Sequence, residues 1–209
     1  PICVKQATMS PAYLSESSNP VTSSTSSTSS TANLDSDTVV LGVFFAEKKG
    51  YPARASIYYS NQPDTEICGK SFYNADDVKI IWSPDGAGVL FHTHADVDKT
   101  GASYYGSTCL YYLSVDGSVD VTVPLAKEGQ IADAQYAPTP PHDFIVIAGN
   151  MPAMITMYNP LAEPIYQFGE AYRNTISYSP NGKYLALAGF GNFSGEIDFN
   201  KLYEQRSNQ

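Results

Sequence analysis

The chain has 209 residues, 43% of them hydrophobic, so it is long enough to bury a sizeable core as one domain or slightly more. Twelve Lys and Arg residues against 21 Asp and Glu give a net charge of −9, and an acidic domain repels phosphate, which excludes a general nucleic-acid surface. No apolar run approaches the roughly 18 residues that a membrane-spanning helix needs.

The start of the chain and its cysteines indicate the cellular compartment of the protein. It begins at Pro1 without an initiator methionine, which we interpret as a fragment or a processed chain. No charged-then-apolar leader precedes Ile2, so no signal peptide is expected. The three cysteines, Cys3, Cys68 and Cys109, are widely spaced and form no CxxC motif, which favours reduced thiols over a disulfide framework. We therefore expect a cytoplasmic protein.

A strand–turn–strand unit recurs four times. Each copy is an apolar strand, a Ser-Pro or Ala-Pro turn and a second apolar strand, with its proline at Pro11, Pro84, Pro138 or Pro180. In the second copy the turn is Ser-Pro-Asp-Gly, in which proline presets φ and Gly86 supplies the positive φ of a tight reversal. Apart from the first interval, the spacing is near the roughly 40–50 residues of one propeller blade. Because no stretch shows a sustained helical period, the pattern predicts an all-β fold, a partial β-propeller.

The expected strands fill about three and a half four-stranded blades. They are Ile2–Met9, Thr38–Ala46 and Arg54–Ser60 in the first blade; Val78–Trp82, Val89–His94, Thr108–Ser114 and Ser118–Val123 in the second; Ile131–Tyr136, Phe144–Ala148, Met154–Tyr158 and Ile165–Phe168 in the third; and Ile176–Tyr178, Tyr184–Ala188 and Gly195–Phe199 in the fourth. Inner strands such as Tyr184–Ala188 are apolar on both faces, as in strands packed between neighbouring blades. We assign residues 1–200 to propeller blades and residues 201–209 to a polar tail.

A low-complexity insertion lengthens the first blade. In Ser15–Thr31, 13 of 17 residues are Ser or Thr and only Glu16 is charged. Such a segment cannot bury enough apolar surface to offset its chain entropy, so we predict a disordered insertion over residues 15–37. A phosphorylated regulatory segment is the alternative, and nothing in the sequence favours it.

His92 and His94 are a candidate metal-binding pair, because they lie two apart on a strand and so share a face, with Asp96 and Asp98 just beyond. No further His or Cys stands at ligand spacing, and a pair of aspartates lacks the ligands of a calcium loop. A structural role is therefore favoured, and His142 is interpreted as a turn residue. We expect no metal and no cofactor.

The sequence lacks the common catalytic motifs. It has no Gly-x-Ser-x-Gly elbow, no HExxH and no Walker-type loop, so we expect no enzymatic activity. Ser-Pro-Asp-Gly repeats also occur in propellers that cap peptidases, where catalysis belongs to a separate domain. An accessory propeller of a peptidase-like enzyme is therefore kept as an alternative.

The loop Asp96–Ser107 is twelve residues long, whereas an ordinary hairpin loop has about two to five. Loops of that length bind a partner or pack as compact surface loops. Lys99 is a cation available to a phosphate or carboxylate, and Tyr104 and Tyr105 can stack on a base or pack against the next blade, packing being favoured.

Several motifs resemble eukaryotic translation initiation factor 2A, the single-chain propeller factor rather than a subunit of the GTP-binding factor. They are Phe72-x-x-Ala75-Asp76-x-Val78, Asp96–Gly106 (DVDKTGASYYG), Gly149-x-Met151-Pro152-Ala153, Phe168-Gly169, Arg173-Asn174 and Ala188–Asn192 with Gly195. The match runs in order from Val39 to Ile197, and the DVDKTGASYYG run is far more specific than any propeller repeat.

The resemblance implies a larger, nine-bladed ring and a non-enzymatic scaffold that associates with the small ribosomal subunit and promotes GTP-independent delivery of initiator tRNA. It attributes tRNA and mRNA contacts to a C-terminal region absent from this chain, and it allows other initiation factors as partners, but no membrane. The candidate partner-binding residues are Lys99, Tyr104, Tyr105, Arg173 and Asn174. A generic WD-type scaffold for protein–protein assembly is the second interpretation.

Overall fold

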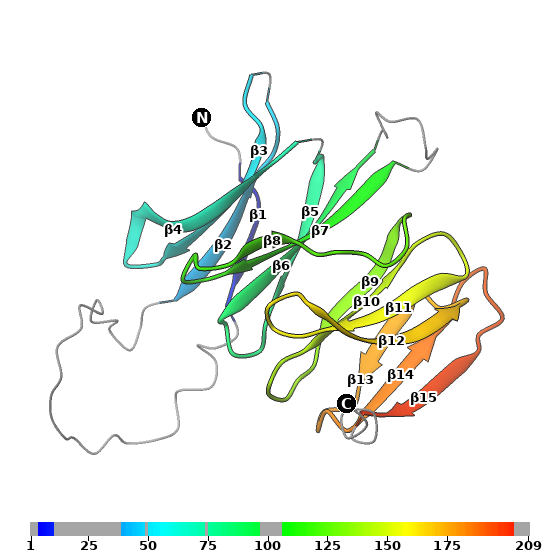
Figure 1. Cartoon of the computed structure of the whole chain (residues 1–209). Coiled ribbons are helices and arrows are strands. Elements are labelled where there is room, and N and C mark those ends of the chain that lie inside the picture. Colours follow the sequence, from blue (N-terminus) through cyan, green and yellow to red (C-terminus); the bar gives the residue numbers. More distant parts are fainter. Residues whose placement is uncertain (1–3, 11–38, 49, 74, 97–105, 203–209) are drawn as a thin grey trace, which may run out of the picture.

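The chain forms four antiparallel sheets in a computed structural model that describes residues 4–10, 39–48, 50–73, 75–96 and 106–202 (Figure 1). The first sheet contains β1 (Val4–Met9), β2 (Val40–Phe45), β3 (Ala53–Tyr59) and β4 (Gln62–Phe72). The second contains β5 (Asp77–Trp82), β6 (Gly88–Ala95), β7 (Ser107–Ser114) and β8 (Asp120–Thr122). The third contains β9 (Ile131–Tyr136), β10 (Phe144–Ala148), β11 (Ala153–Tyr158) and β12 (Pro164–Ala171), and the fourth β13 (Thr175–Tyr178), β14 (Tyr184–Ala188) and β15 (Ile197–Lys201).

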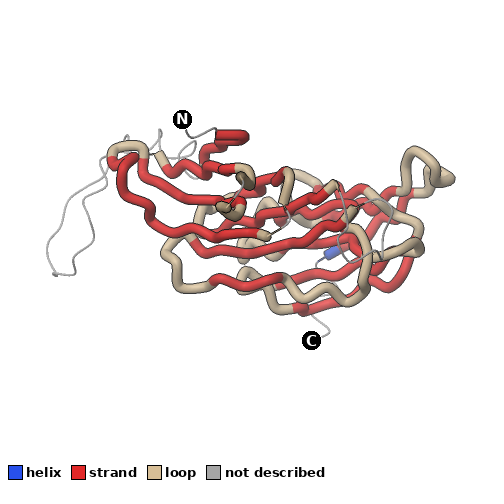
Figure 2. The backbone as a smooth tube through the Cα atoms, turned by 90° about the horizontal axis from the view of Figure 1, so that it is seen from above, coloured by secondary structure: helices blue, strands red, loops and turns tan. Residues whose placement is uncertain are grey.

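Each sheet is a meander, because its strands pair with their neighbours in chain order. Three apolar clusters hold the sheets together, one between each successive pair: Phe44, Ile57 and Phe91 belong to the first cluster, and Ile145 and Leu187 to the third. Figure 1 shows the sheets fanned in sequence order, which is the arrangement of propeller blades, and Figure 2 shows the same strands from above. The prediction of an all-β partial propeller is confirmed, and among the described residues three sheets have four strands and the last has three.

Two strands differ from the expectation. β4 (Gln62–Phe72) was not predicted, because it opens with polar residues and its first half is exposed at the outer edge of the first sheet. β15 extends to Lys201, which pairs with Tyr184, and the next residue, Leu202, is only 3% exposed and packs in the third apolar cluster, so the last sheet and its core reach two residues further than expected. The predicted disordered insertion, residues 15–37, lies outside the described residues, as does the tail from residue 203.

The connections divide between two ends of the sheets. The turns that join first to second and third to fourth strands lie at one end, here called the turn end, toward the lower left in Figure 1. The connections β2–β3, β6–β7, β10–β11 and β14–β15, together with those that lead from one sheet to the next, lie at the other end, here called the loop end. Within the described ranges, no helix has the length and apolar character that crossing a bilayer requires.

The Ser-Pro-Asp-Gly turn at the turn end is closed by its own side chains. Ser83 Oγ donates to Asp85 Oδ1 at 2.6 Å and accepts the Gly88 N–H at 2.9 Å, while Gly86 N–H donates to the Ser83 carbonyl at 2.9 Å. Gly86 has φ 69°, as predicted. The turn at Ser179 repeats this arrangement, with Asn181 in the place of the aspartate.

Candidate functional site

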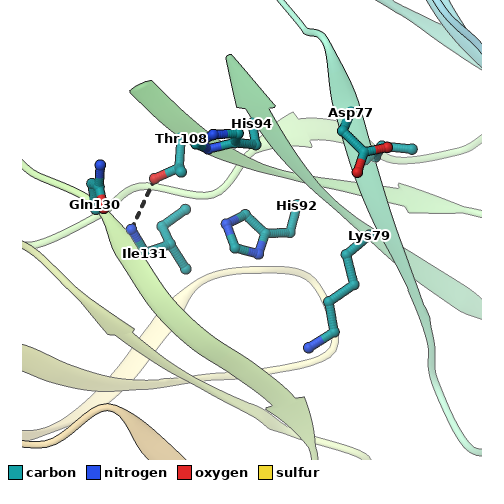
Figure 3. Close-up of a pocket in the computed structure, with 8 residues that line it drawn as sticks. Asp77, Lys79, His92, His94, Thr108, Gln130 and Ile131 are labelled. Atoms are coloured by element: carbon teal, nitrogen blue, oxygen red, sulfur yellow. Dashed lines mark hydrogen bonds between the residues drawn. The ribbon is translucent and has the colours of Figure 1, made fainter. Parts of the chain in front are cut away.

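A polar groove of about 620 Å³ opens between the second and third sheets, at the loop end (Figure 3). Here it is called the interblade groove. Strands of the second sheet supply most of its lining, and β9 with the residue before it closes the other side. The residues that line it are Asp77, Val78, Lys79, His92, His94, Thr108, Gln130 and Ile131.

Strand register explains why these side chains meet. Lys79 lies opposite His92, and Asp77 lies opposite His94 across the β5–β6 pair. His94 in turn faces Thr108 across β6–β7. Because alternate residues of a strand share a face, the two histidines line the same groove, as their spacing predicted.

His92 is the most enclosed titratable group of the groove. Its Nε2 is buried and has no hydrogen-bond partner among the described residues. Burial is the main reason that the pKa of His92 lies below its ordinary value, and the neighbouring Lys79 and His94 lower it further, against the opposing effect of Asp133. The imidazole is therefore neutral at neutral pH, and it offers the groove a polar nitrogen rather than a charge.

Asp133 on β9 connects the second, third and fourth sheets next to the groove residue Lys79, and sequence reasoning missed it. Its side chain is 13% exposed, and its Oδ1 lies 3.8 Å from Lys79 Nζ of the second sheet. Its Oδ2 accepts the Ile176 backbone N–H of the fourth sheet at 3.0 Å. The signal in the sequence was an acidic residue in the middle of a short inner strand. Lys79 is 62% exposed, so its ammonium group remains accessible to a ligand.

The base of the long loop adjoins the groove and is held firmly. Asp96 N–H donates to Asp76 Oδ2, and Asp76 N–H donates to the His94 carbonyl, both at 2.9 Å. At Gly106, with φ 80°, a Cβ atom would come within 2.0 Å of the Ala95 carbonyl oxygen, so only glycine fits. The predicted contact residues of the loop, Lys99, Tyr104 and Tyr105, lie outside the described residues.

Arg173 and Asn174 lie elsewhere, in the connection between the third and fourth sheets. The Arg173 side chain is 7% exposed and forms ion pairs with Asp198 at 2.9 Å and Glu196 at 3.2 Å. The hydrogen bond with Asp198 is the main reason that the pKa of Arg173 is raised. Asn174 Oδ1 accepts the Phe190 N–H and its Nδ2 donates to the Phe190 carbonyl, each at 3.0 Å. Both side chains thus fix the β14–β15 connection.

The groove can bind a polar group, since it offers an ammonium, two imidazoles and a hydroxyl. Thr108 Oγ1 is already used, because it accepts the Ile131 N–H at 2.8 Å (Figure 3). In the part of the chain that the structure describes, no three His, Cys, Asp or Glu side chains lie close enough to hold a metal ion.

Cys68 and Cys109 are free thiols, and burial is the main cause that raises the pKa of Cys68 to about 11.

Fold and groove together define a β-propeller with a polar groove between two of its blades. Residues 70–208 match the family described as "Eukaryotic translation initiation factor eIF2A". The chain belongs to this family.

Curated relatives are similar in sequence to this chain over most of its length. Eukaryotic translation initiation factor 2A of Dictyostelium discoideum is 43% identical over 160 residues, which cover 76% of this chain and 26% of the relative. The factor of the same name from Drosophila melanogaster is 37% identical over 72% of this chain and 24% of its own length. The chain thus spans about a quarter of the curated relatives that it matches.

A solved structure agrees with the fold. The structure described as "Crystal structure of the eukaryotic initiation factor" is 31% identical to this chain and superposes with a TM-score of 0.68. The superposition covers 80% of this chain and 39% of that one. The resemblance expected from the DVDKTGASYYG run is therefore confirmed at the level of family and fold.

Proposed function

We propose that this chain serves translation initiation as a non-enzymatic cytoplasmic scaffold, which associates with the small ribosomal subunit and supports GTP-independent delivery of initiator tRNA. The observation that carries the proposal is the family membership, with 43% identity to a named initiation factor over 76% of the chain. A propeller suits such a role, because rigid blades present their loops at fixed positions to a partner.

The loop Asp96–Gly106 is the proposed contact with the subunit. It leaves the sheet beside the interblade groove, from the rigid base formed by Asp76 and Gly106. Lys99 provides the charged contact, and Tyr104 or Tyr105 stacks against the partner or braces the loop. Because the chain carries a net charge of −9, Lys99 acts locally and not as part of a wide phosphate-binding field.

Contacts with initiator tRNA and mRNA are assigned to regions outside this chain, and other initiation factors are further partners. An acidic chain gains little from counterion release on RNA, which supports this division. Arg173 and Asn174 contribute to partner binding by holding the β14–β15 connection in place, since their polar groups are engaged within the chain.

Co-sedimentation with purified small ribosomal subunits tests the proposal. Lys99→Glu should weaken co-sedimentation at low and moderate salt while leaving the melting temperature almost unchanged. Lys183→Glu is the matched control, because Lys183 is an exposed lysine at the turn end. Tyr105→Ala should lower the melting temperature as well if the ring packs against the next blade.

Two results would contradict this reasoning. If Lys99→Glu binds the subunit like the unchanged chain, the loop is structural and the binding surface lies elsewhere. If the unchanged chain does not sediment with the subunit at all, the proposed association is wrong for this part of the factor.

A further inference from the structure

Large apolar side chains are exposed at the loop end, where the connections leave the sheets. Five of them define a surface here called the aromatic end surface: Tyr51 (76% exposed), Tyr73 (82%), Met151 (36%), Tyr172 (56%) and Phe190 (49%). These side chains belong to the first, third and fourth sheets, and exposed apolar side chains of this size at one end of a fold mark a candidate interaction surface.

The exposed positions repeat from blade to blade. Tyr51 lies two residues before β3 and Tyr73 directly follows β4, at the end of the sheet where Ala53 pairs with Phe72. In the third sheet, Met151 lies two residues before β11 and Tyr172 directly follows β12, where Ala153 pairs with Ala171. The same pair of strand ends thus presents an apolar pair in both blades.

The fourth sheet continues the surface. Phe190 is held by both polar atoms of Asn174, which is two residues from Tyr172. Phe193 packs near Tyr172, with ring centroids 6.2 Å apart.

Unfinished blade packing does not account for these side chains. Ile197 and Phe199 are also exposed, but they lie on β15, within a sheet face that a further strand or blade would cover. The aromatic end surface lies instead in connections at the sheet ends, which remain accessible when blades pack side by side.

Among the described residues, carboxylates outnumber cations at this end. Lys48 lies three residues before Tyr51 and is exposed, and Lys79 of the interblade groove is 62% exposed, whereas Lys127 and Arg173 are engaged in ion pairs. Lys127 pairs with Glu170 at 3.1 Å and donates to the Pro152 carbonyl at 2.6 Å, and Arg173 pairs with Glu196 and Asp198. The exposed acidic residues at this end are Glu47, Asp76, Asp77, Asp96, Glu128, Glu170, Glu196 and Asp198. The surface therefore combines exposed aromatic rings with excess negative charge.

We propose that the aromatic end surface docks a lysine- and arginine-rich segment of a protein partner, its cationic groups lying over the tyrosine rings and against the carboxylates. Cations are attracted to the faces of aromatic rings, and the fold already uses this contact: Lys70 Nζ lies 5.0 Å from the centroid of the Tyr111 ring. RNA fits less well, since its phosphates would meet the same carboxylates. Only the source of the basic segment rests on the proposed function: a ribosomal subunit would supply it, because ribosomes contain basic proteins as well as RNA.

Fluorescence anisotropy with the 209-residue chain and no ribosomes tests the docking directly. One probe is a labelled peptide that alternates arginine and lysine with small apolar residues, and the other is single-stranded oligouridine of equal length. The peptide should bind, less tightly as salt is added, and the RNA should not bind. Tyr51→Ala combined with Tyr73→Ala should weaken peptide binding about five- to tenfold, because two ring contacts are lost.

Tyr184→Ala is the matched control, because Tyr184 is 49% exposed but lies at the turn end. It should leave peptide affinity unchanged, whereas Glu128→Lys should weaken it about twofold to fivefold. The proposal is overturned if the RNA binds and the peptide does not, if neither binds, or if Tyr184→Ala weakens peptide binding as much as the double variant does.

This outcome can be separated from that of the proposed function. If the unchanged chain sediments with ribosomal subunits but does not bind the peptide, the docking of a basic segment is refuted and the proposed ribosomal association is not. Peptide binding that depends on Tyr51 and Tyr73, in a chain that does not sediment with the subunit, supports the docking surface and refutes the ribosomal association.

Discussion

Replacing Trp82 tests how the first two blades are joined. Trp82 ends β5, and its Nε1 donates to Thr8 Oγ1 on β1 at 2.9 Å. The ring also lies against β2, where a Cβ atom on Gly42 would come within 3.1 Å of it. This tryptophan, only partly buried, therefore packs between two sheets.

The expected loss for Trp82→Ala follows from these contacts. A fully buried large aromatic residue costs about 3–5 kcal/mol when it is cut to alanine. Because the ring is partly buried, we expect the lower part of that range, about 3 kcal/mol, of which about 1 kcal/mol is the hydrogen bond. That is a substantial share of the roughly 5–15 kcal/mol that stabilise an ordinary domain.

Urea unfolding of the chain, followed by circular dichroism, measures the loss. Trp82→Phe keeps a ring between the sheets but removes the donor, so it should cost only about 1 kcal/mol. Combined with Thr8→Val in a double-mutant cycle, it should show a coupling energy of about 0.5–1 kcal/mol. A loss below about 1 kcal/mol for Trp82→Ala would refute the packing argument, and zero coupling would refute the hydrogen bond.

Three further outcomes are expected. Because burial lowers the pKa of His92, the folded state binds fewer protons than the unfolded state below about pH 6.5, so the unfolding free energy should fall from about pH 7 to about pH 5. His92→Gln should flatten this fall in urea titrations and His94→Gln should not; equal slopes in both would contradict it. Iodoacetamide should label exposed Cys109 well before Cys68, whose raised pKa of about 11 suppresses the thiolate, as peptide mass spectrometry can show; simultaneous labelling would disprove this. Gly86→Ala should lower stability by about 1–2 kcal/mol in thermal melts, since its φ is 69°, and an unchanged melting temperature would be inconsistent with the turn.

The elements that sequence predicted well are those fixed by local chemistry. The turn at Ser83 closes through contacts that span five residues, so its residues alone specify it. The inner strand β10 is buried along its whole length and stands out as a short apolar run. Both signals are independent of the rest of the fold, and the structure has turns and strands where they were expected.

Elements whose role depends on distant partners were not predictable in this way. β4 is an outer strand with an exposed polar start, so it carries no alternating apolar pattern. Asp133 acquires its role only when Ile176, 43 residues later, brings a backbone N–H to its carboxylate. The interblade groove likewise requires the second and third sheets to pack before its lining exists.

Arg173 shows why the binding character of the loop end could not be taken from a count of charges. In the sequence it is a basic residue beside a tyrosine and an asparagine, which favours a contact with a partner's acidic group. In the fold, Glu196, directly before β15, and Asp198, on β15, both form ion pairs with Arg173. The Arg173 side chain is nearly enclosed. The two carboxylates remain 65% and 52% exposed, and Tyr172 beside it is 56% exposed. A position that looks cationic in the sequence therefore presents a ring and negative charge to solvent, which favours a basic partner at this end of the propeller.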